Sequence, residues 1–200
     1  YLTHTSLVRG HLYVGIELYK NQYFENAKRH MKHPKSELYS AMIPTFEVKN
    51  TDGFASELED LALTVESDED LNLVLSKYEI LLNAITENEK IVDSESSTFG
   101  KKVALVETLL EIAAEEYAIG IVNGNVKNKF EYQDALGFTV VAKNILDEAK
   151  SLSSSDNIKR DKIIEIINSL MPLWPSLVPI EKISGDAKVI LEAVSQIKSI

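Results

Sequence analysis

The sequence has no cysteine, a single tryptophan and few of the residues that interrupt helices, with eight glycines and five prolines among 200 residues. The absence of cysteine excludes disulfides, thiolate catalysis, and the zinc and iron–sulfur sites that depend on cysteine ligands. It also excludes the cysteine motif that attaches c-type haem, and nothing else in the sequence marks a haem pocket. A metal site in this chain would have to use histidine or oxygen ligands.

Long apolar runs and an excess of positive charge are missing as well. No stretch approaches the roughly 18 consecutive apolar residues of a membrane-spanning helix, so we expect no membrane span in this chain. The formal net charge of −10 disfavours nucleic acid as a partner, because phosphate binding needs a basic surface. The same charge suits cationic partners, including metal ions.

Motifs for catalysis are also lacking. The sequence contains no glycine-rich phosphate loop, no H-E-x-x-H metal-hydrolase motif and no spacing typical of a nucleophile with its base. We therefore expect neither a nucleotide cofactor nor enzymatic activity.

Hydrophobic residues recur at helical spacing along most of the chain. Leu7, Val14 and Leu18 illustrate the pattern in the first segment, residues 3–20. We count about eight such segments and no convincing strand, and we read "NGN" at 123–125 as a helix C-terminal cap. Short connections favour antiparallel neighbours, so the sequence predicts an all-α bundle of helical hairpins.

A polar stretch, "DSESSTFG", is the best candidate for a boundary within the chain. It predicts an N-terminal helical half over residues 1–93 and a C-terminal helical half over 94–200. One continuous domain is the alternative.

All four histidines lie in the first 33 residues. His4 and His11 share the apolar stripe of residues 3–20, because positions 4, 7, 11, 14 and 18 step by three and four. If residues 3–33 form an antiparallel hairpin, His11 faces His30, His33 lies near Val8, and His4 would face Glu37.

These histidines have three interpretations. As ligands for iron, copper or zinc they would form two partial sites, His11 with His30, and His4 with His33 or Glu37. His4 and His11 cannot share an ion easily, because seven helical residues separate them by about 10.5 Å. The rings could instead be hydrogen-bonded parts of the core, or they could form a pH-sensitive surface between the helices.

Carboxylates in the C-terminal half offer a secondary candidate site. Glu111 and Glu115 belong to a row with i, i+4 spacing, and Glu131 and Asp134 follow in the next helix. A solvated acidic face explains such a row, whereas a hard-cation or ferric-ion site would use its oxygen ligands. The Glu-x-x-His pair of di-iron bundles is absent from this half.

Residues 109–138, "LLEIAAEEYAIGIVNGNVKNKFEYQDALGF", resemble the extracytoplasmic helical domain that precedes the membrane part of bacterial high-affinity iron permeases. The shared pattern is an alanine-rich helix ending in an acidic residue and tyrosine, a glycine-containing turn, and then "EY", an acidic or amide residue and phenylalanine. It falls here on Glu116, Tyr117, Gly124, Glu131, Tyr132, Gln133, Asp134 and Phe138. The resemblance implies an export-compartment helical domain associated with metal uptake.

A looser similarity is to the imelysin-like family of periplasmic helical proteins, which are also associated with iron. The Gly-x-His-x-x-Glu pattern of that family is not present, since "HPKSE" has one more residue between His33 and Glu37.

Together these features favour a periplasmic, all-helical protein that binds a metal ion through its histidine hairpin. The sequence begins at Tyr1 without a methionine, and removal of an export signal is one explanation. The alternative function is a non-catalytic module that binds a partner protein, with structural histidines.

Overall fold

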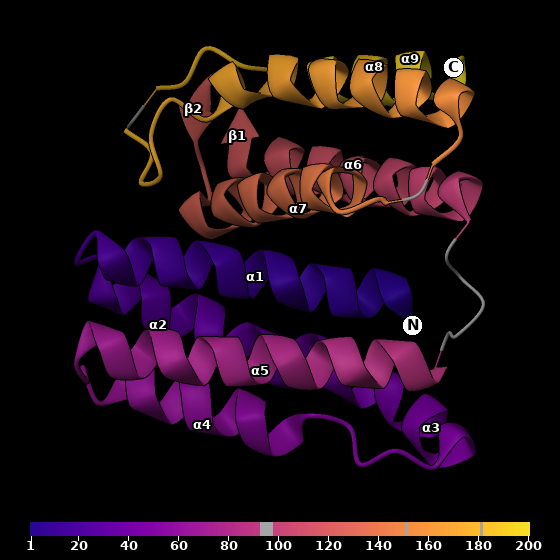
Figure 1. Cartoon of the computed structure of the whole chain (residues 1–200). Coiled ribbons are helices and arrows are strands. Elements are labelled where there is room, and N and C mark those ends of the chain that lie inside the picture. Colours follow the sequence, from indigo (N-terminus) through magenta and orange to yellow (C-terminus); the bar gives the residue numbers. More distant parts are fainter. Residues whose placement is uncertain (93–97, 151, 181) are drawn as a thin grey trace. The chain divides into compact units, whose positions relative to one another are not determined.

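The computed structural model describes residues 1–92, 98–150, 152–180 and 182–200, which fold mainly into α-helices (Figure 1). The predicted all-α fold is therefore confirmed. The chain divides into two compact units, Tyr1–Glu95 and Ser96–Ile200, and each is described by itself. The boundary expected at 93 and 94 lies outside the described residues.

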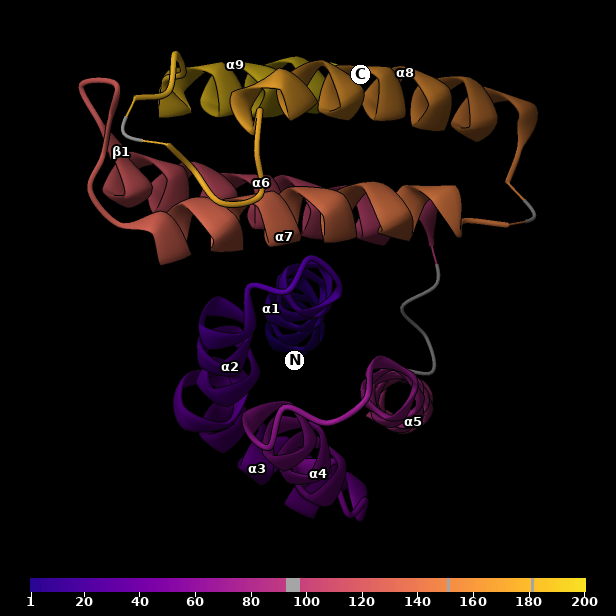
Figure 2. The same cartoon turned by 90° about the vertical axis from the view of Figure 1, so that its left-hand side faces the viewer.

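The first unit is a bundle of antiparallel helices. Contacts run from α1 to α2, from α2 to α4, from α4 to α5, and from α5 back to α1, so these four helices form a closed ring, seen nearly end-on in Figure 2. Its elements are α1 (Leu2–Lys20), α2 (Phe24–His33), a π-helical turn (Pro34–Leu38), α3 (Tyr39–Lys49), α4 (Ala55–Glu66) and α5 (Leu71–Val92).

Helical periodicity explains the core of this unit. On α5 the buried residues Val74, Leu81, Ile85 and Val92 are spaced by seven, four and seven positions, which places them on one face. α2 ends at His33, where a π-helical turn begins at Pro34. His33 keeps α-helical dihedrals, φ −55° and ψ −48°, so the expectation that the residue before proline leaves the helical region is wrong here.

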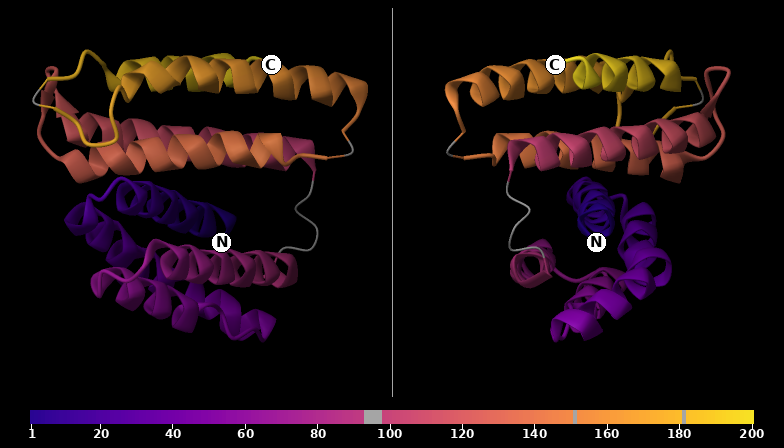
Figure 3. Two further views of the ribbon diagram at one scale, coloured as in Figure 1. Left: turned by 60° about the vertical axis from the view of Figure 1, so that its left-hand side comes forward. Right: turned by 90° about the vertical axis from the view of Figure 1, so that its right-hand side faces the viewer.

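The second unit has two layers of helices. α6 and α7 lie side by side in one layer, and α8 and α9 form the other, as Figures 2 and 3 show. Its elements are α6 (Phe99–Gly120), β1 (Ile121–Val122), β2 (Asn125–Val126), α7 (Lys129–Asp147), α8 (Ser154–Leu170), a 3₁₀ turn (Met171–Leu173) and α9 (Ala187–Lys198).

The interpretation of "NGN" as a helix cap is wrong, and the expectation of no strand is wrong at the same place. α6 ends at Gly120, and β1 and β2 form a two-residue antiparallel hairpin in which Ile121 pairs with Val126. Asn123 and Gly124 both have positive φ, 52° and 73°, as a two-residue hairpin turn requires. An Asn-Gly pair between β-branched residues is the sequence signal that identifies such a turn.

Gly120 allows this hairpin to close tightly. Its carbonyl accepts a hydrogen bond from the backbone amide of Lys127 at 2.8 Å. A Cβ at position 120 would lie 2.7 Å from the backbone nitrogen of Tyr132, closer than packed atoms can come. The start of α7 therefore approaches the end of α6 only because residue 120 has no side chain.

The single tryptophan anchors the segment between α8 and α9 to the other layer. Trp174 is 7% exposed and donates from Nε1 to the carbonyl of Tyr132 at 2.9 Å. Its ring packs edge-on against Tyr117, with 5.5 Å between centroids, and Tyr117 donates from its hydroxyl to the carbonyl of Leu173. Trp174 is thus a core residue whose fluorescence reports on the folding of this unit.

We predict that Gly120→Ala destabilises the second unit by about 2–3 kcal/mol, because backbone atoms of α7 cannot move aside as a flexible side chain can. Urea unfolding followed by Trp174 fluorescence measures the change. Gly100→Ala is the matched control, since a Cβ there meets nothing within 4 Å. The control should keep or slightly raise stability, by less than about 1 kcal/mol, and equal losses in both variants would contradict the prediction.

Candidate metal site

A tight hairpin of α1 and α2 carries the histidines of the first unit. The turn closes with the amide of Tyr23 donating to the carbonyl of Leu18 at 2.9 Å, and Gln22 adopts a positive φ of 63°. Gly15 leaves room for the side chain of Met31 on α2, since a Cβ there would lie 2.6 Å from its terminal methyl. Helix α2 is thereby held against the face of α1 that bears His11.

Three imidazole rings meet between these helices. The ring of His11 lies 6.2 Å from that of His30 and 5.8 Å from that of His33, measured between centroids. His30 and His33 are 6.3 Å apart. We refer to His11, His30 and His33 as the three-histidine group; His11 and His30 are buried, and His33 is half-buried.

The facing of His11 and His30 follows the hairpin arithmetic, and His33 lies beside these same two rings. Residues three apart lie on the same face of a helix, so His33 joins His30 rather than continuing along a straight ladder. His4 lies about 10.5 Å before His11 along α1. Burial, and after it the positive N-terminus, lower the pKa of His4, so its neutral form is favoured.

Glu37 lies at the edge of the three-histidine group. Its Oε1 is 3.9 Å from Nδ1 of His33, and its side chain is exposed on the turn after α2. Glu37 is therefore close to His33, a contact that the hairpin arithmetic, which placed Glu37 opposite His4, did not predict.

The spacing of the three rings is close to that of a metal site. If each ring placed one nitrogen about 2.0–2.1 Å from a shared ion, the centroids would be roughly 5 Å apart. The observed spacings of 5.8–6.3 Å are wider by about one ångström. Small rotations of the side chains would close the difference, and three imidazoles would leave other coordination positions open.

A surface hollow of about 370 Å³ reaches His33 from the solvent. Ion pairs line it, with Lys28 bonded to Glu25 at 3.1 Å and Lys32 bonded to Glu66 at 2.8 Å. The residues that form its wall are Glu25, Lys28, Arg29, Lys32, His33 and Glu66. The hollow gives an ion a path to one ring of the three-histidine group.

Among the acidic candidates of the second unit, Glu111 has a partner of its own. Glu111 accepts an ion pair from Lys198 of α9 at 2.6 Å, and Glu115 is exposed. On α7, Glu131 accepts a hydrogen bond from the side-chain amide of Asn128 at 3.0 Å. Asp134 is buried on the same helix. The row therefore loses Glu111 to a structural ion pair.

The carboxyl of Glu116 on α6 interacts with the carboxyls of α7, although Glu116 is not part of the row with i, i+4 spacing. Its pKa is raised from 4.5 to about 8. The largest cause is burial, followed by a hydrogen bond to Glu131 and by the negative charges of Glu131, Asp134 and Glu115. At neutral pH Glu116 is therefore protonated and donates a hydrogen bond to Glu131.

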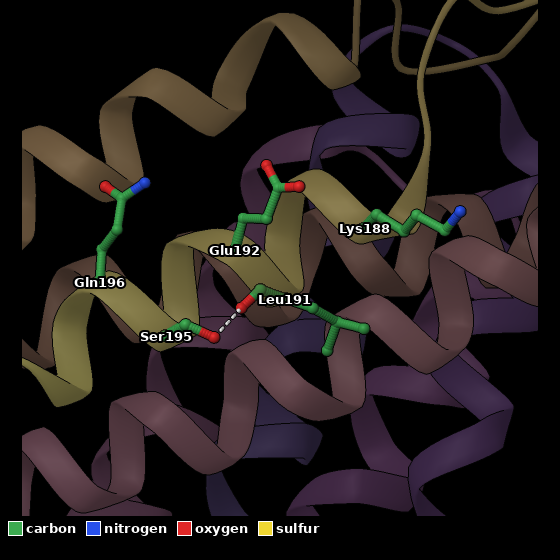
Figure 4. A pocket seen from close by; sticks show the side chains of 5 residues that line it. All are labelled: Lys188, Leu191, Glu192, Ser195 and Gln196. Carbon is green, nitrogen blue, oxygen red and sulfur yellow. Dashed lines mark hydrogen bonds between the residues drawn. The ribbon is translucent and has the colours of Figure 1, made fainter.

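A second hollow, of about 450 Å³, lies on the exposed side of α9 (Figure 4). All of its lining residues come from this one helix, and in Figure 4 their polar ends point in different directions. They are Lys188, Leu191, Glu192, Ser195 and Gln196. No convergent set of ligands forms among these five, so the three-histidine group is the stronger candidate.

The raised pKa of Glu116 predicts a pH-dependent stability of the second unit. Between about pH 4.5 and 8 the folded unit keeps a proton that the unfolded chain releases, so the free energy of unfolding falls as the pH rises through this window. Glu116→Gln imitates the protonated form. We expect the variant to be more stable than the parent at pH 8.5, on the order of 2 kcal/mol, and similar at pH 4.5.

Urea unfolding followed by Trp174 fluorescence at the two pH values measures this slope. Glu115→Gln is the matched control, because it removes a neighbouring charge but leaves the proton shared by Glu116 and Glu131. This variant should keep most of the pH dependence of the free energy of unfolding. An unchanged slope in Glu116→Gln would show that another group carries the pH dependence.

Comparison with known proteins identifies the family. Residues 93–200, more than half of the chain, match the iron permease-associated 4-helix bundle domain. Neither a curated protein nor a solved structure gives a significant match. Within the described residues, no helix is long and apolar enough to cross a membrane.

The matched region begins just after α5 and contains α6, α7, α8 and α9, whose two-layer arrangement agrees with the description of a 4-helix bundle. The hairpin with the three-histidine group precedes it. The match includes residues 109–138, so the resemblance to the iron-permease helical domain is confirmed. The chain belongs to the family of the iron permease-associated 4-helix bundle domain.

Proposed function

We propose that this protein binds a transition-metal ion through His11, His30 and His33, outside the cytoplasm and in connection with iron uptake. The observation that carries the proposal is that two helices of one unit bring three imidazole rings within 6.3 Å of one another. Its role is to bind the ion without catalysis.

Imidazole nitrogen is a donor for iron, copper and zinc ions. The three rings come from α1 and α2, which pack against each other and hold the rings 5.8–6.3 Å apart. His33 is half-buried and lines the hollow, so an ion can reach it from the solvent. His11 and His30 are buried, so their rings are held in place by the surrounding side chains.

Membership in the family supplies the iron context, and the likeness to an extracytoplasmic domain supports the location. The carboxyls of the matched region are the less suitable ligands near neutral pH. An ion bound by Glu116 and Glu131 would have to displace a proton that is retained up to about pH 8.

We predict that Zn²⁺, Cu²⁺ or Fe²⁺, the last under oxygen-free conditions, raises the unfolding temperature of the full chain. Binding to the folded state alone stabilises it by about 2.7 kcal/mol when the free ion is at 100 times its dissociation constant. Calorimetric scans with and without each ion measure the shift. His11→Ala with His33→Ala should abolish it.

His4→Ala is the matched control, since it removes the remaining histidine of the chain from the same helix as His11. It should retain the full shift. Circular dichroism establishes that each variant is folded, and His33→Asn provides a milder change at a half-buried position. Absence of a shift with all three ions would refute metal binding and favour the alternative, a protein-binding module with structural histidines.

A further inference from the structure

Helix α5 carries two apolar stripes on neighbouring faces. The first is buried in the core of the first unit and consists of Val74, Leu81, Ile85 and Val92. The second has the same spacing one residue earlier in the sequence, and its three large side chains are 43–52% exposed. They are Leu73, Ile80 and Ile91, and half-buried Ala84 lies between them. One stripe is enough to attach α5 to its unit, so the exposed stripe indicates a surface on which another helix packs.

The exposed stripe has the repeat of a coiled coil. Its positions are 73, 77, 80, 84, 87 and 91, which step alternately by four and three over about 27 Å of the helix. Four of these positions are apolar, and the other two carry opposite charges. We refer to the whole set as the α5 stripe; its members are Leu73, Lys77, Ile80, Ala84, Glu87 and Ile91.

The α5 stripe is complementary to itself in the antiparallel direction. If two copies of α5 pack around a twofold axis at the level of Leu82, every position of the stripe faces another position of the stripe. The facing pairs are Leu73 with Ile91, Ile80 with Ala84, and Lys77 with Glu87. Apolar side chains therefore meet apolar side chains, and each copy supplies one cation and one anion to two ion pairs across the contact.

Charge also selects the direction of packing. In a parallel pair Lys77 would face Lys77 of the second copy, and Glu87 would face Glu87, which destabilises the contact. Within one chain Lys77 bonds to Asp60 at 3.1 Å, and Glu87 bonds to Lys90 at 2.7 Å. Exposed ion pairs of this kind contribute little to stability, so both side chains can exchange or share partners when a second helix arrives.

From the α5 stripe we infer that the chain forms a twofold-symmetric dimer in which α5 packs antiparallel against α5 of a second copy. The contact uses an exposed face of the first unit and none of the histidines, so the inference is independent of the proposed metal site. The formal charge of −10 on each copy opposes association at low ionic strength.

Sedimentation velocity of the full chain over a concentration series tests the inference, in about 0.15 M salt, where charges more than about 8 Å apart are screened. We expect a reversible equilibrium between monomer and dimer. Lys77→Glu or Glu87→Lys alone should weaken the dimer by at least about 10-fold, because each change places like charges opposite one another at two points. The double variant, Lys77→Glu with Glu87→Lys, should restore the dissociation constant of the parent to within about threefold, because it only exchanges the charges of each pair.

Ile80→Ser removes an apolar contact at the centre of the stripe and should also weaken the dimer by at least about 10-fold. Glu79→Lys is the matched control for Glu87→Lys, since Glu79 is exposed on the same helix and lies off the stripe. It should leave the dissociation constant unchanged, and circular dichroism establishes that each variant is folded.

A parent chain that stays monomeric throughout the series would overturn the inference. A dimer that none of the stripe variants weakens would overturn it as well, because that dimer would use another surface. If the single charge variants weaken the dimer and the double variant fails to restore it, the antiparallel pairing is wrong.

Discussion

The close packing of α1 against α2 sets the geometry on which the candidate metal site depends. α1 and α2 pack against each other along the hairpin, and Gly15 accommodates the side chain of Met31 at this contact. The three-residue turn that joins the helices removes any freedom to slide, so the ring of His11 comes to rest across from His30 and His33.

A second glycine has the corresponding role in the other unit, with a different chemical result. Gly120 brings the start of α7 against the end of α6, and this draws Glu116 toward Glu131. Carboxyls that are close and partly buried cannot all ionise, so one keeps its proton. Helix packing thus yields a cluster of imidazoles in one unit and a carboxyl pair that shares a proton in the other.

Some features of the candidate site could be predicted from the sequence. The other predictions were incomplete or wrong for physical reasons. The facing of His11 and His30 follows from the length of the hairpin, but His33 was misplaced because facing arithmetic ignores the rotation of side chains about the helix axis. Glu116 escaped attention because it falls outside the i, i+4 row, and Glu111 was assigned to that row although it pairs with Lys198. The β-hairpin was missed although Asn123 and Gly124 carry its signal.

The sequence by itself determined that the chain is all-α. It also determined the family, through the match of residues 93–200. Both depend on local patterns, since hydrophobic spacing and the scarcity of helix-breaking residues act within each helix. Only the tertiary structure decided which imidazoles meet and which carboxyl retains a proton. Those outcomes depend on the distance and rotation between neighbouring helices, which side-chain packing between elements sets at positions such as Gly120.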